Sequence, residues 1–400
     1  MGRAKELFME IEEHGYDYLL KGEKYLCAHH FRDKYLNGYI DKSGKTGVCS
    51  YCGRKESVID MTDFKKHIYK VVLKYFDDLD AECMPLASSY FEEDDEHIPG
   101  IKRVGSYAVP TEADVYEDIS EFVNDLELYT DNDDLNNDID NIFNDRIWIK
   151  KHPFERWWNE EKELQWRRFS YMVMHLRRFT FLAQQAEYSE DNILESIGRV
   201  LCNTNAILHS IATGTKIYRT RSFDKKPNGY LEFTDITSAP DKYAGQCRMS
   251  PAGVSMFYGA YDKNTAIQEC IKLPNAKVLA IGKFTTKCEL TVVDLTKLPT
   301  DFSIWMDHWQ EVSFLNSFHK DITQPLSNEV KEKIDYVPSQ IFTEYLRWMF
   351  VDKDGNNIHG FIYRSNKTSK ANIVLFCNNN DSHEWMELES CTFENINNIF

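Results

Sequence analysis

The stretch 245–270 is rich in side chains that bind phosphate, stack on rings or stabilise positive charge. It reads GQCRMSPAGVSMFYGAYDKNTAIQEC and includes Arg248, Tyr258, Tyr261 and Glu269. An arginine binds phosphate through paired N–H donors, a tyrosine ring stacks on a flat base, and a carboxylate stabilises a developing cation. Together these residue types form a dense set of groups that could build a functional site.

Further polar residues of the second half of the chain fall on strands and turns. Tyr218 and Arg219 lie on one expected strand, and Ser365 ends another. We expect Glu269 in the first turns of a helix that begins with an Asn or Thr cap. Taken singly, each residue also has a structural explanation, since arginines pair with surface acids and tyrosines fill cores.

A second group of residues near the N-terminus has the spacing of metal ligands. Cys27 and His30 form a CxxH pair, and Cys49 and Cys52 form a CxxC pair after a short loop. Each pair turns two ligands toward one tetrahedral centre, which is the pattern of structural zinc. His29 competes for the fourth place, but the CxxH register favours His30. Four protein ligands leave no open position, so we expect zinc to stabilise the fold and take no part in chemistry.

Composition limits the classes of partner and compartment. The 400 residues include 64 acidic and 47 basic side chains, a formal charge of −17, which argues against broad binding of nucleic acid or anionic membranes. No stretch is long and apolar enough to span a membrane, and the charged N-terminus is unlike a signal peptide. We therefore expect a cytoplasmic protein whose ten cysteines are reduced outside the metal cluster.

Hydrophobic periodicity predicts mostly helices in the first half and mixed structure in the second. An acidic loop is expected at 90–100, and the Asp/Asn run at 131–140 indicates a solvated connection that lacks the glycine and final glutamate of a calcium-binding EF-hand. The predicted helices span 3–20, 62–76, 112–128, 155–186, 192–211, 264–272 and 338–350, and the predicted strands span 217–221, 277–284, 289–295, 360–365 and 372–376.

Arg168 and His175 offer a different chemistry. They lie two turns apart on one face of the longest expected helix, with six residues between them. Helical nucleases of the HEPN class use an Arg-x(4-6)-His motif, so a ribonuclease pair is one interpretation. A packed or salt-bridged pair is the alternative that this common spacing favours.

Six blocks in the second half resemble, in order, the signature of the RES domain, which is named for its Arg, Glu and Ser. The blocks are YRTR, GQCRMSPAGVSMFYGAYDKNTAIQE, VVDL, DYVPSQ, GFIYRSN and NIVLF, within residues 211–377. The preceding region is similar to the HEPN/RES N-terminal domain of some members. The implied architecture is a zinc-knuckle segment (1–60), a helical domain (61–210) and an α+β catalytic domain (211–400) with the split mixed sheet of ADP-ribosyltransferases.

The resemblance implies roles for individual residues. The two family arginines fall on Arg219 and Arg248, the glutamate on Glu269 and the serine on Ser365. Tyr218 and Tyr258 match the aromatic positions and would bind substrate together with Arg248, whereas Arg219, Glu269 and Ser365 would be catalytic. Two positions depart from the usual Gly-Arg-x-Asn block, because Cys247 lies between Gln246 and the arginine and Ser250 replaces the asparagine.

The resemblance further implies an NAD+-consuming enzyme, a glycohydrolase or phosphorylase that acts as a toxin or in defence. An Xre-type antitoxin or another regulatory protein would be its partner. The sequence is also compatible with two alternative functions. One is an ADP-ribosyltransferase that modifies a macromolecule, and the other is a zinc-knuckle HEPN protein that binds or cuts RNA.

Overall fold

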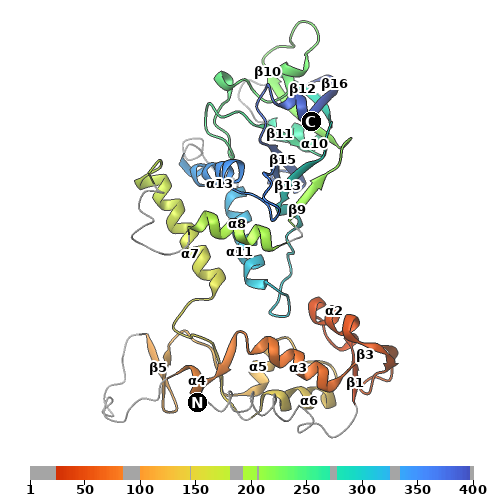
Figure 1. The fold of residues 1–400 in the computed structure, drawn as a ribbon, viewed down its shortest axis with the longest axis vertical. Coiled ribbons are helices and arrows are strands. Elements are labelled where there is room, and N and C mark those ends of the chain that lie inside the picture. The colour runs from red at the N-terminus through yellow and green to blue at the C-terminus, as the bar shows by residue number, and fades with distance from the viewer. Residues whose placement is uncertain are drawn as a thin grey trace. The chain divides into compact units, whose positions relative to one another are not determined.

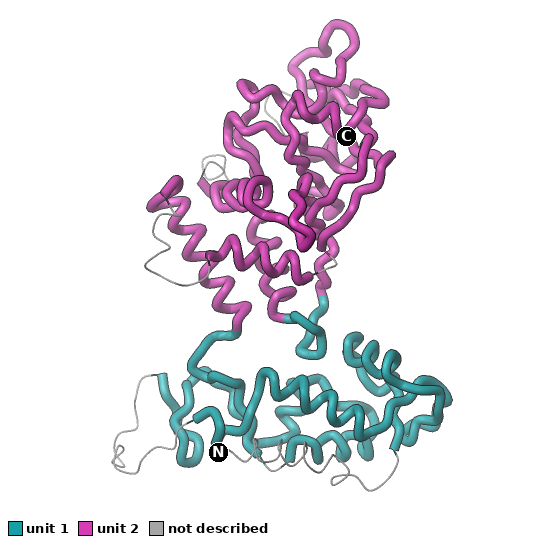
Figure 2. Tube along the Cα trace, viewed as in Figure 1, with its two compact units in different colours: residues 1–157, 301–309 teal, residues 158–300, 310–400 magenta. Residues whose placement is uncertain are grey.

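The computed structural model describes residues 24–83, 100–144, 146–180, 192–204, 207–270, 277–324 and 334–396. The chain forms two compact units, drawn in different colours in Figure 2. The first comprises residues 1–157 together with 301–309, and the second comprises 158–300 and 310–400. One short piece of the second half therefore belongs to the first unit.

The first unit contains short helices and three small sheets, so the prediction of a helical N-terminal half describes only part of it. The strand orders are β1-β3-β2, β4-β8-β7 and β5-β6, all antiparallel. The strands are β1 (Tyr25–Cys27), β2 (Lys45–Val48), β3 (Lys55–Asp60), β4 (Phe76–Asp78), β5 (Ile101–Val104), β6 (Tyr107–Pro110), β7 (Val115–Tyr116) and β8 (Trp148–Lys150). The helices are η2 (Ala28–His30), α2 (Lys34–Ser43), α3 (Met61–Val72), α4 (Leu79–Glu82), α5 (Ile119–Asp125) and α6 (Asp133–Phe143).

Aspartate caps fix where the helices of this unit begin. The Asp33 side chain accepts hydrogen bonds from the backbone N–H groups of Tyr35 and Leu36 at the start of α2. Asp60 does the same for α3 with the N–H of Thr62. These bonds satisfy N–H groups that have no partner within the helix.

The prediction of a solvated connection at 131–140 is wrong, because most of this run forms α6. The Asn132 side chain caps the helix by accepting from the N–H of Leu135. Leu135, Ile139 and Phe143 follow at intervals of four residues and are fully buried. One apolar residue per turn is enough to bury a helix face even when nearly all the other positions, Ile142 excepted, are acidic or amide-bearing.

The second unit is built on one mixed eight-stranded sheet, in the order β16-β12-β10-β11-β15-β14-β13-β9 (Figure 1). Only β13 and β14 run parallel among these neighbours. The strands are β9 (Leu208–Ile211), β10 (Lys216–Phe223), β11 (Phe257–Ala260), β12 (Val278–Thr286), β13 (Leu290–Asp294), β14 (Gly360–Arg364), β15 (Ala371–Leu375) and β16 (Met386–Asn395). The helices are α7 (Trp158–Tyr171), η3 (Met172–Leu176), α8 (Ile193–Asn203), α9 (Phe233–Ile236), η5 (Asp241–Tyr243), α10 (Lys263–Cys270), η6 (Leu295–Lys297), α11 (Trp309–Thr323), α13 (Val337–Trp348) and α14 (Ser382–Trp385).

Alternation along the strands places apolar side chains on both faces of this sheet. Phe361 of β14 and Val374 of β15 pack with helices α7, α8, α11 and α13 in one core. Their neighbours Ile362 and Ile373 belong to a second core on the other face. Because successive strand residues point to opposite faces, the central strands are buried on both sides and read as continuous apolar runs.

The strands and helices predicted for the second half correspond to β10, β12, β13, β14, β15, α10 and α13, whereas α11 and β16 were not predicted. Two predicted helices are shorter than expected, since 112–128 contains β7 before α5, and 192–211 contains β9 after α8. The predicted helix 3–20, nearly all of the loop 90–100 and the end of the helix 155–186 lie outside the described residues. Within the described residues, no helix has the length and apolarity needed to cross a membrane.

Candidate active site and metal-binding cluster

Four neighbouring strands carry or flank most of the predicted active-site residues. Strand β10 carries Tyr218 and Arg219, and β11 carries Tyr258. In the sheet β10 pairs with β11, β11 with β15, and β15 with β14, after which Ser365 follows directly. Helix α10 begins just beyond β11, so Glu269 reaches the same region from residues close in sequence.

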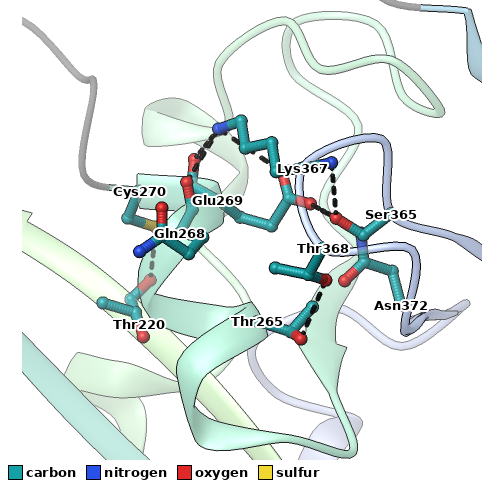
Figure 3. A network of polar contacts seen from close by, with 9 residues as sticks. All are labelled: Thr220, Thr265, Gln268, Glu269, Cys270, Ser365, Lys367, Thr368 and Asn372. Carbon is teal, nitrogen blue, oxygen red and sulfur yellow. Dashed lines mark hydrogen bonds and ion pairs between the residues drawn. The ribbon is translucent and has the colours of Figure 1, made fainter.

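The Glu269 carboxylate is held by two hydrogen bonds to the same oxygen. Its Oε1 accepts from the Ser365 hydroxyl at 2.6 Å and from the Asn372 amide at 2.9 Å (Figure 3). Ser365 and Asn372 are buried, with 3% and 4% exposure, whereas the glutamate side chain keeps 37% of its surface exposed. Two buried hydrogen-bond donors therefore hold the carboxylate in position, while part of the Glu269 side chain stays accessible to solvent.

The Lys367 side chain forms an ion pair with the other oxygen of this carboxylate. Its ammonium is 3.6 Å from Glu269 Oε2 and also donates to the backbone carbonyls of Gln268 and Glu269 at 2.9 and 3.1 Å. A lysine at the end of a helix neutralises the exposed carbonyls of the last turn. Sequence reasoning missed Lys367, because it lies in a loop between two predicted strands and has no motif of its own.

Glu269 is placed differently from the sequence expectation. It is the penultimate residue of α10, not a residue of the first turns, and the cap is Asp262, whose Oδ1 accepts from the N–H of Thr265 at 3.0 Å. The Thr265 hydroxyl is also 3.0 Å from that of Thr368, which ties the helix to the loop after β14 (Figure 3). The helix thus starts nearer to β11 and presents its end to Ser365.

Arg219 makes several backbone hydrogen bonds in the structure. Its Nε donates to the carbonyls of Ile236 and Thr237, both at 3.1 Å, and its Nη1 donates to the carbonyl of Tyr258 at 2.7 Å. The guanidinium also lies over the ring of Phe257 at 5.3 Å. Burial lowers the pKa of Arg219, though an arginine stays charged. This residue therefore joins β10 to β11 and to the loop after α9, and its Nη2 is its only nitrogen without a hydrogen bond to the described residues.

Arg248 lies in a turn that another signature block holds in place. The Ser339 hydroxyl donates to the carbonyl of Arg248 at 2.7 Å, and the Gln340 amide donates to the carbonyl of Cys247 at 2.8 Å. The guanidinium itself donates once, from Nη1 to the carbonyl of Ile322 at 3.2 Å. The DYVPSQ block thus has a structural role that its sequence alone did not reveal.

Ser250, one of the two departures from the family pattern, contacts the predicted stacking residue. Its hydroxyl lies 2.8 Å from that of Tyr258, and its carbonyl accepts from the N–H of Cys247 at 2.9 Å. Burial is the main reason why the pKa of Tyr258 is well above its usual value, so the phenol keeps its proton. The backbone of Ser250 closes the turn, and its hydroxyl contacts the tyrosine.

The Tyr363 phenol is influenced by the charges of both Arg248 and Glu269. Burial is the largest cause of the raised pKa of Tyr363, and the Glu269 carboxylate raises this pKa further. The Arg248 guanidinium lowers it. Both charges are therefore close enough to act on one phenol of β14. The structure brings Glu269 together with Ser365 and Arg219 together with Tyr258, with Arg248 nearby, while Tyr218 is half-buried one residue from Arg219 and has no hydrogen bond to them.

The four predicted metal ligands form one cluster in the first unit. The ligand atoms of Cys27, His30, Cys49 and Cys52 all lie within 4.8 Å of one another. Cys27 Sγ is 3.6 Å from Cys52 Sγ, and His30 Nε2 is 3.3 Å from Cys49 Sγ. Ligand atoms around a tetrahedral zinc lie roughly 3.8 Å apart, given Zn–S bonds of about 2.3 Å. The geometry and the soft, borderline donor set both fit a metal ion.

Local structure explains how the cluster forms. Cys27 ends β1, and the short helix η2 places His30 three residues later. After β2, the N–H of Gly53 donates to the carbonyl of Cys49 at 2.9 Å and closes a turn that contains Cys52. Gly53 has a φ of 72°, a conformation that glycine adopts without strain.

Arg168 and His175 do not form a site of this kind. Arg168 is exposed on α7, and His175 is exposed on the π-helical turn η3, where its ring contacts Tyr171 at 5.0 Å. The π turn interrupts the helix between them, so the two-turn spacing no longer places them on one face.

Each half of the chain matches the model of a known protein family. The model of the HEPN/RES N-terminal domain 1 matches residues 42–187, and the model of the RES domain matches residues 216–392. No curated protein matches. A solved structure, described as the crystal structure of the M. tuberculosis MbcT–MbcA toxin–antitoxin complex, aligns at 12% identity over 51% of this chain and 94% of that chain, with a TM-score of 0.30. The chain is a RES-domain protein with a HEPN/RES N-terminal domain.

Proposed function

We propose that this protein cleaves the bond between nicotinamide and ribose in NAD+. The RES resemblance supplies the substrate, and the observation that carries the proposal is the Glu269 carboxylate, held by Ser365 and Asn372 yet open to solvent. A fixed, reachable carboxylate is what a reaction through a cationic sugar requires.

The reaction would follow the chemistry of glycoside cleavage. The C–N bond breaks and its electron pair stays on the nicotinamide nitrogen, which neutralises the pyridinium. The ribose becomes an oxocarbenium-like cation that the Glu269 carboxylate stabilises. The oxygen of water or of inorganic phosphate then bonds to the sugar carbon, and water releases a proton. The products are nicotinamide with ADP-ribose, or nicotinamide with a phosphorylated ADP-ribose.

The arginines would bind the two phosphates of the substrate. Arg248 has two nitrogens without a hydrogen bond to the described residues, and Arg219 has one. Arginine donors match phosphate oxygens, so Arg248 is the principal phosphate ligand and Arg219 supports the strands while offering one nitrogen. Tyr258 and Tyr218 would contact the rings of the dinucleotide.

The decisive experiment measures nicotinamide released from NAD+ by the full chain. We expect Glu269→Gln to lower the rate by a factor of about 100 or more, because the charge that stabilises the cation is gone. Glu387→Gln, at an exposed position of β16, is the control and should keep wild-type activity.

Product analysis then identifies the acceptor. Reactions with and without phosphate separate hydrolysis from phosphorolysis, and labelled NAD+ that ends on protein or nucleic acid would indicate ADP-ribosyl transfer. The proposal fails if wild-type protein releases no nicotinamide in either buffer, or if Glu269→Gln is as active as Glu387→Gln.

We also propose that the Cys27 cluster holds structural zinc. The prediction is one zinc per chain by elemental analysis, lost in Cys49→Ser and kept in Cys391→Ser, whose thiol lies outside the cluster. Because zinc binding contributes about 10–16 kcal/mol in small modules, a strong chelator should lower the melting temperature of the first unit. Stoichiometric zinc in Cys49→Ser would contradict the assignment.

A toxin or defence role and a restraining partner complete the proposal. Unrestrained cleavage of NAD+ would exhaust a cell's own supply, so we expect an antitoxin or other regulatory protein to bind this chain. Expression of the wild type should arrest growth and lower cellular NAD+, and expression of Glu269→Gln should do neither.

A further inference from the structure

A cavity of about 390 Å³ lies in the first unit, and its lining contains none of the predicted active-site residues. Helix α2 contributes Tyr39 and Lys42, and helix α3 contributes His67 and Lys70, with Lys74 just beyond its end. The segment 304–307 completes the lining. Residues three and four apart share a helix face, which explains how each helix directs several side chains to one place.

Three lysines line this cavity without a partner. In the described part of the chain, Lys42, Lys70 and Lys74 have no carboxylate within ion-pair distance and no hydrogen bond from the ammonium group. Some other lysines of the same unit are paired, as in the bridges Lys24–Asp138 and Lys34–Asp301, both at 2.5 Å, whereas Lys45 and Lys55 in its described part are not. Lys42, Lys70 and Lys74 are exposed to solvent, and what sets them apart is that all three line the same cavity in a chain of net charge −17. Such groups attract an anion.

The remaining titratable groups leave the cavity positive at neutral pH. His67 stacks on Tyr39, with ring centroids 3.4 Å apart. Burial, followed by Lys74, lowers the pKa of His67 to about 4, so its ring is uncharged at pH 7, and Asp307 opposes this shift. Asp307 is the only carboxylate among the lining residues. Three ammonium groups against one carboxylate leave a charge of two.

A neighbouring cavity gives an internal comparison. It measures about 360 Å³ and shares Ile304 and Trp305 with the first, but its lining contains Asp125 and Glu127 and no lysine, arginine or histidine. The two cavities are alike in size and opposite in charge, and the acidic one is richer in aromatic side chains. The positive charge is therefore a property of one cavity and not of the whole unit.

We propose that the cavity lined by Lys42, Lys70 and Lys74 binds a nucleoside monophosphate. Two net positive charges match a phosphate monoester, which carries close to two negative charges at pH 7. The rings of Tyr35, Tyr39 and Trp305 line the same space, and aromatic side chains favour a flat base. The volume lies within the range of small-molecule sites and favours one nucleotide over a polymer. This site is separate from the proposed active site.

The test is calorimetric titration of the full chain carrying Glu269→Gln, with AMP, adenosine, inorganic phosphate and a six-nucleotide RNA as probes. AMP should bind at least about tenfold tighter than either adenosine or inorganic phosphate. Adenosine lacks the phosphate group that the lysines would bind, and inorganic phosphate lacks the base that the aromatic rings would contact. Lys70→Ala/Lys74→Ala should weaken AMP at least about tenfold, and Lys70→Arg/Lys74→Arg should retain binding. The matched control Lys45→Ala/Lys55→Ala removes the same charge from two exposed positions that do not line the cavity, and it should leave AMP binding unchanged.

Four outcomes would overturn the proposal. They are no detectable AMP binding, AMP binding that Lys70→Ala/Lys74→Ala leaves unchanged, AMP binding that only Arg248→Ala removes, and RNA binding tighter than AMP. The third would place the nucleotide at the RES site, and the fourth would make the lysines part of a polymer surface. None of these outcomes depends on whether the protein releases nicotinamide from NAD+.

Discussion

The pair of hydroxyls on Ser250 and Tyr258 shows how a single residue can adapt a site. Ser250 is 2% exposed, and its hydroxyl is within 2.8 Å of the tyrosine hydroxyl. The side chain that departs from the family pattern is therefore part of the local hydrogen-bond network. Its loss would affect the orientation of the ring, whereas the turn is closed by the backbone carbonyl of the same residue.

Ser250→Ala should destabilise the protein by about 1–3 kcal/mol, because it removes the hydroxyl that contacts a buried phenol at 2.8 Å. Ser250→Ala/Tyr258→Phe removes both hydroxyls and should recover part of that loss. Chemical denaturation of the two variants and of Tyr258→Phe forms a double-mutant cycle. Additive losses in the cycle would show that the two hydroxyls do not interact.

Residue types were easier to predict than their partners. The sequence indicated Glu269, Ser365, Arg219 and Arg248, since their blocks occur in a recognisable order. It could not indicate that Arg219 binds backbone carbonyls, because those of Ile236 and Thr237 come from the end of the short helix α9, which no pattern predicted. Contacts between distant backbone groups are set by the fold and leave no trace in local spacing.

At the scale of elements, close approach between β14 and β15 depends on glycine. A Cβ atom at Gly360 would lie 2.0 Å from the backbone carbonyl oxygen of Val374, far inside van der Waals contact. Gly360 pairs with Val292 on one side and Leu375 on the other, so neither neighbour can move alone. The two strands carry Tyr363 and Asn372 to the Glu269 region.

Gly360→Ala should therefore lower stability by about 2–4 kcal/mol, since the strain falls on backbone that cannot relax. Gly245→Ala is the matched control, because a Cβ there meets nothing within 4 Å. Differential scanning calorimetry of both variants checks the difference. Equal melting temperatures would show that the sheet accommodates the methyl group.

Elements of the second unit were predicted better than those of the first for a physical reason. Central strands such as β12 and β13 are buried on both faces and give continuous apolar runs. The strands of the first unit are two to six residues long, too short to show an alternation. Helix α6 was missed because its three buried residues are outnumbered by Asp and Asn.

At the scale of the whole molecule, buried histidines link stability to pH. His319 is 8% exposed, and its Nε2 accepts from the N–H of Arg364 at 3.4 Å. Burial, followed by the charge of Arg364, lowers its pKa to about 4. In the unfolded chain the His319 ring takes up a proton near pH 6.5, whereas in the folded chain it does so only near pH 4. Between these two pH values a proton therefore binds the unfolded state more readily, and acid favours unfolding.

The free energy of unfolding should fall as the pH is lowered from about 6.5 to about 4, with His319 contributing up to about 3 kcal/mol. His319→Gln cannot take up this proton, so its stability should depend less steeply on pH over the same interval. Urea titrations of both proteins at several pH values measure the two slopes. Parallel slopes would show that His319 is not protonated on unfolding in this range.

The segment 301–309 has a consequence for the gene. Its flanking residues belong to the second unit, yet Trp305 is 7% exposed in the core of the first, where its indole N–H donates to the carbonyl of Leu126 at 3.1 Å. Neither unit is therefore encoded by one uninterrupted stretch of DNA. A recombination event that exchanged everything after codon 210 would also exchange the segment that packs under Leu126, so the core of the first unit would then come from two parents.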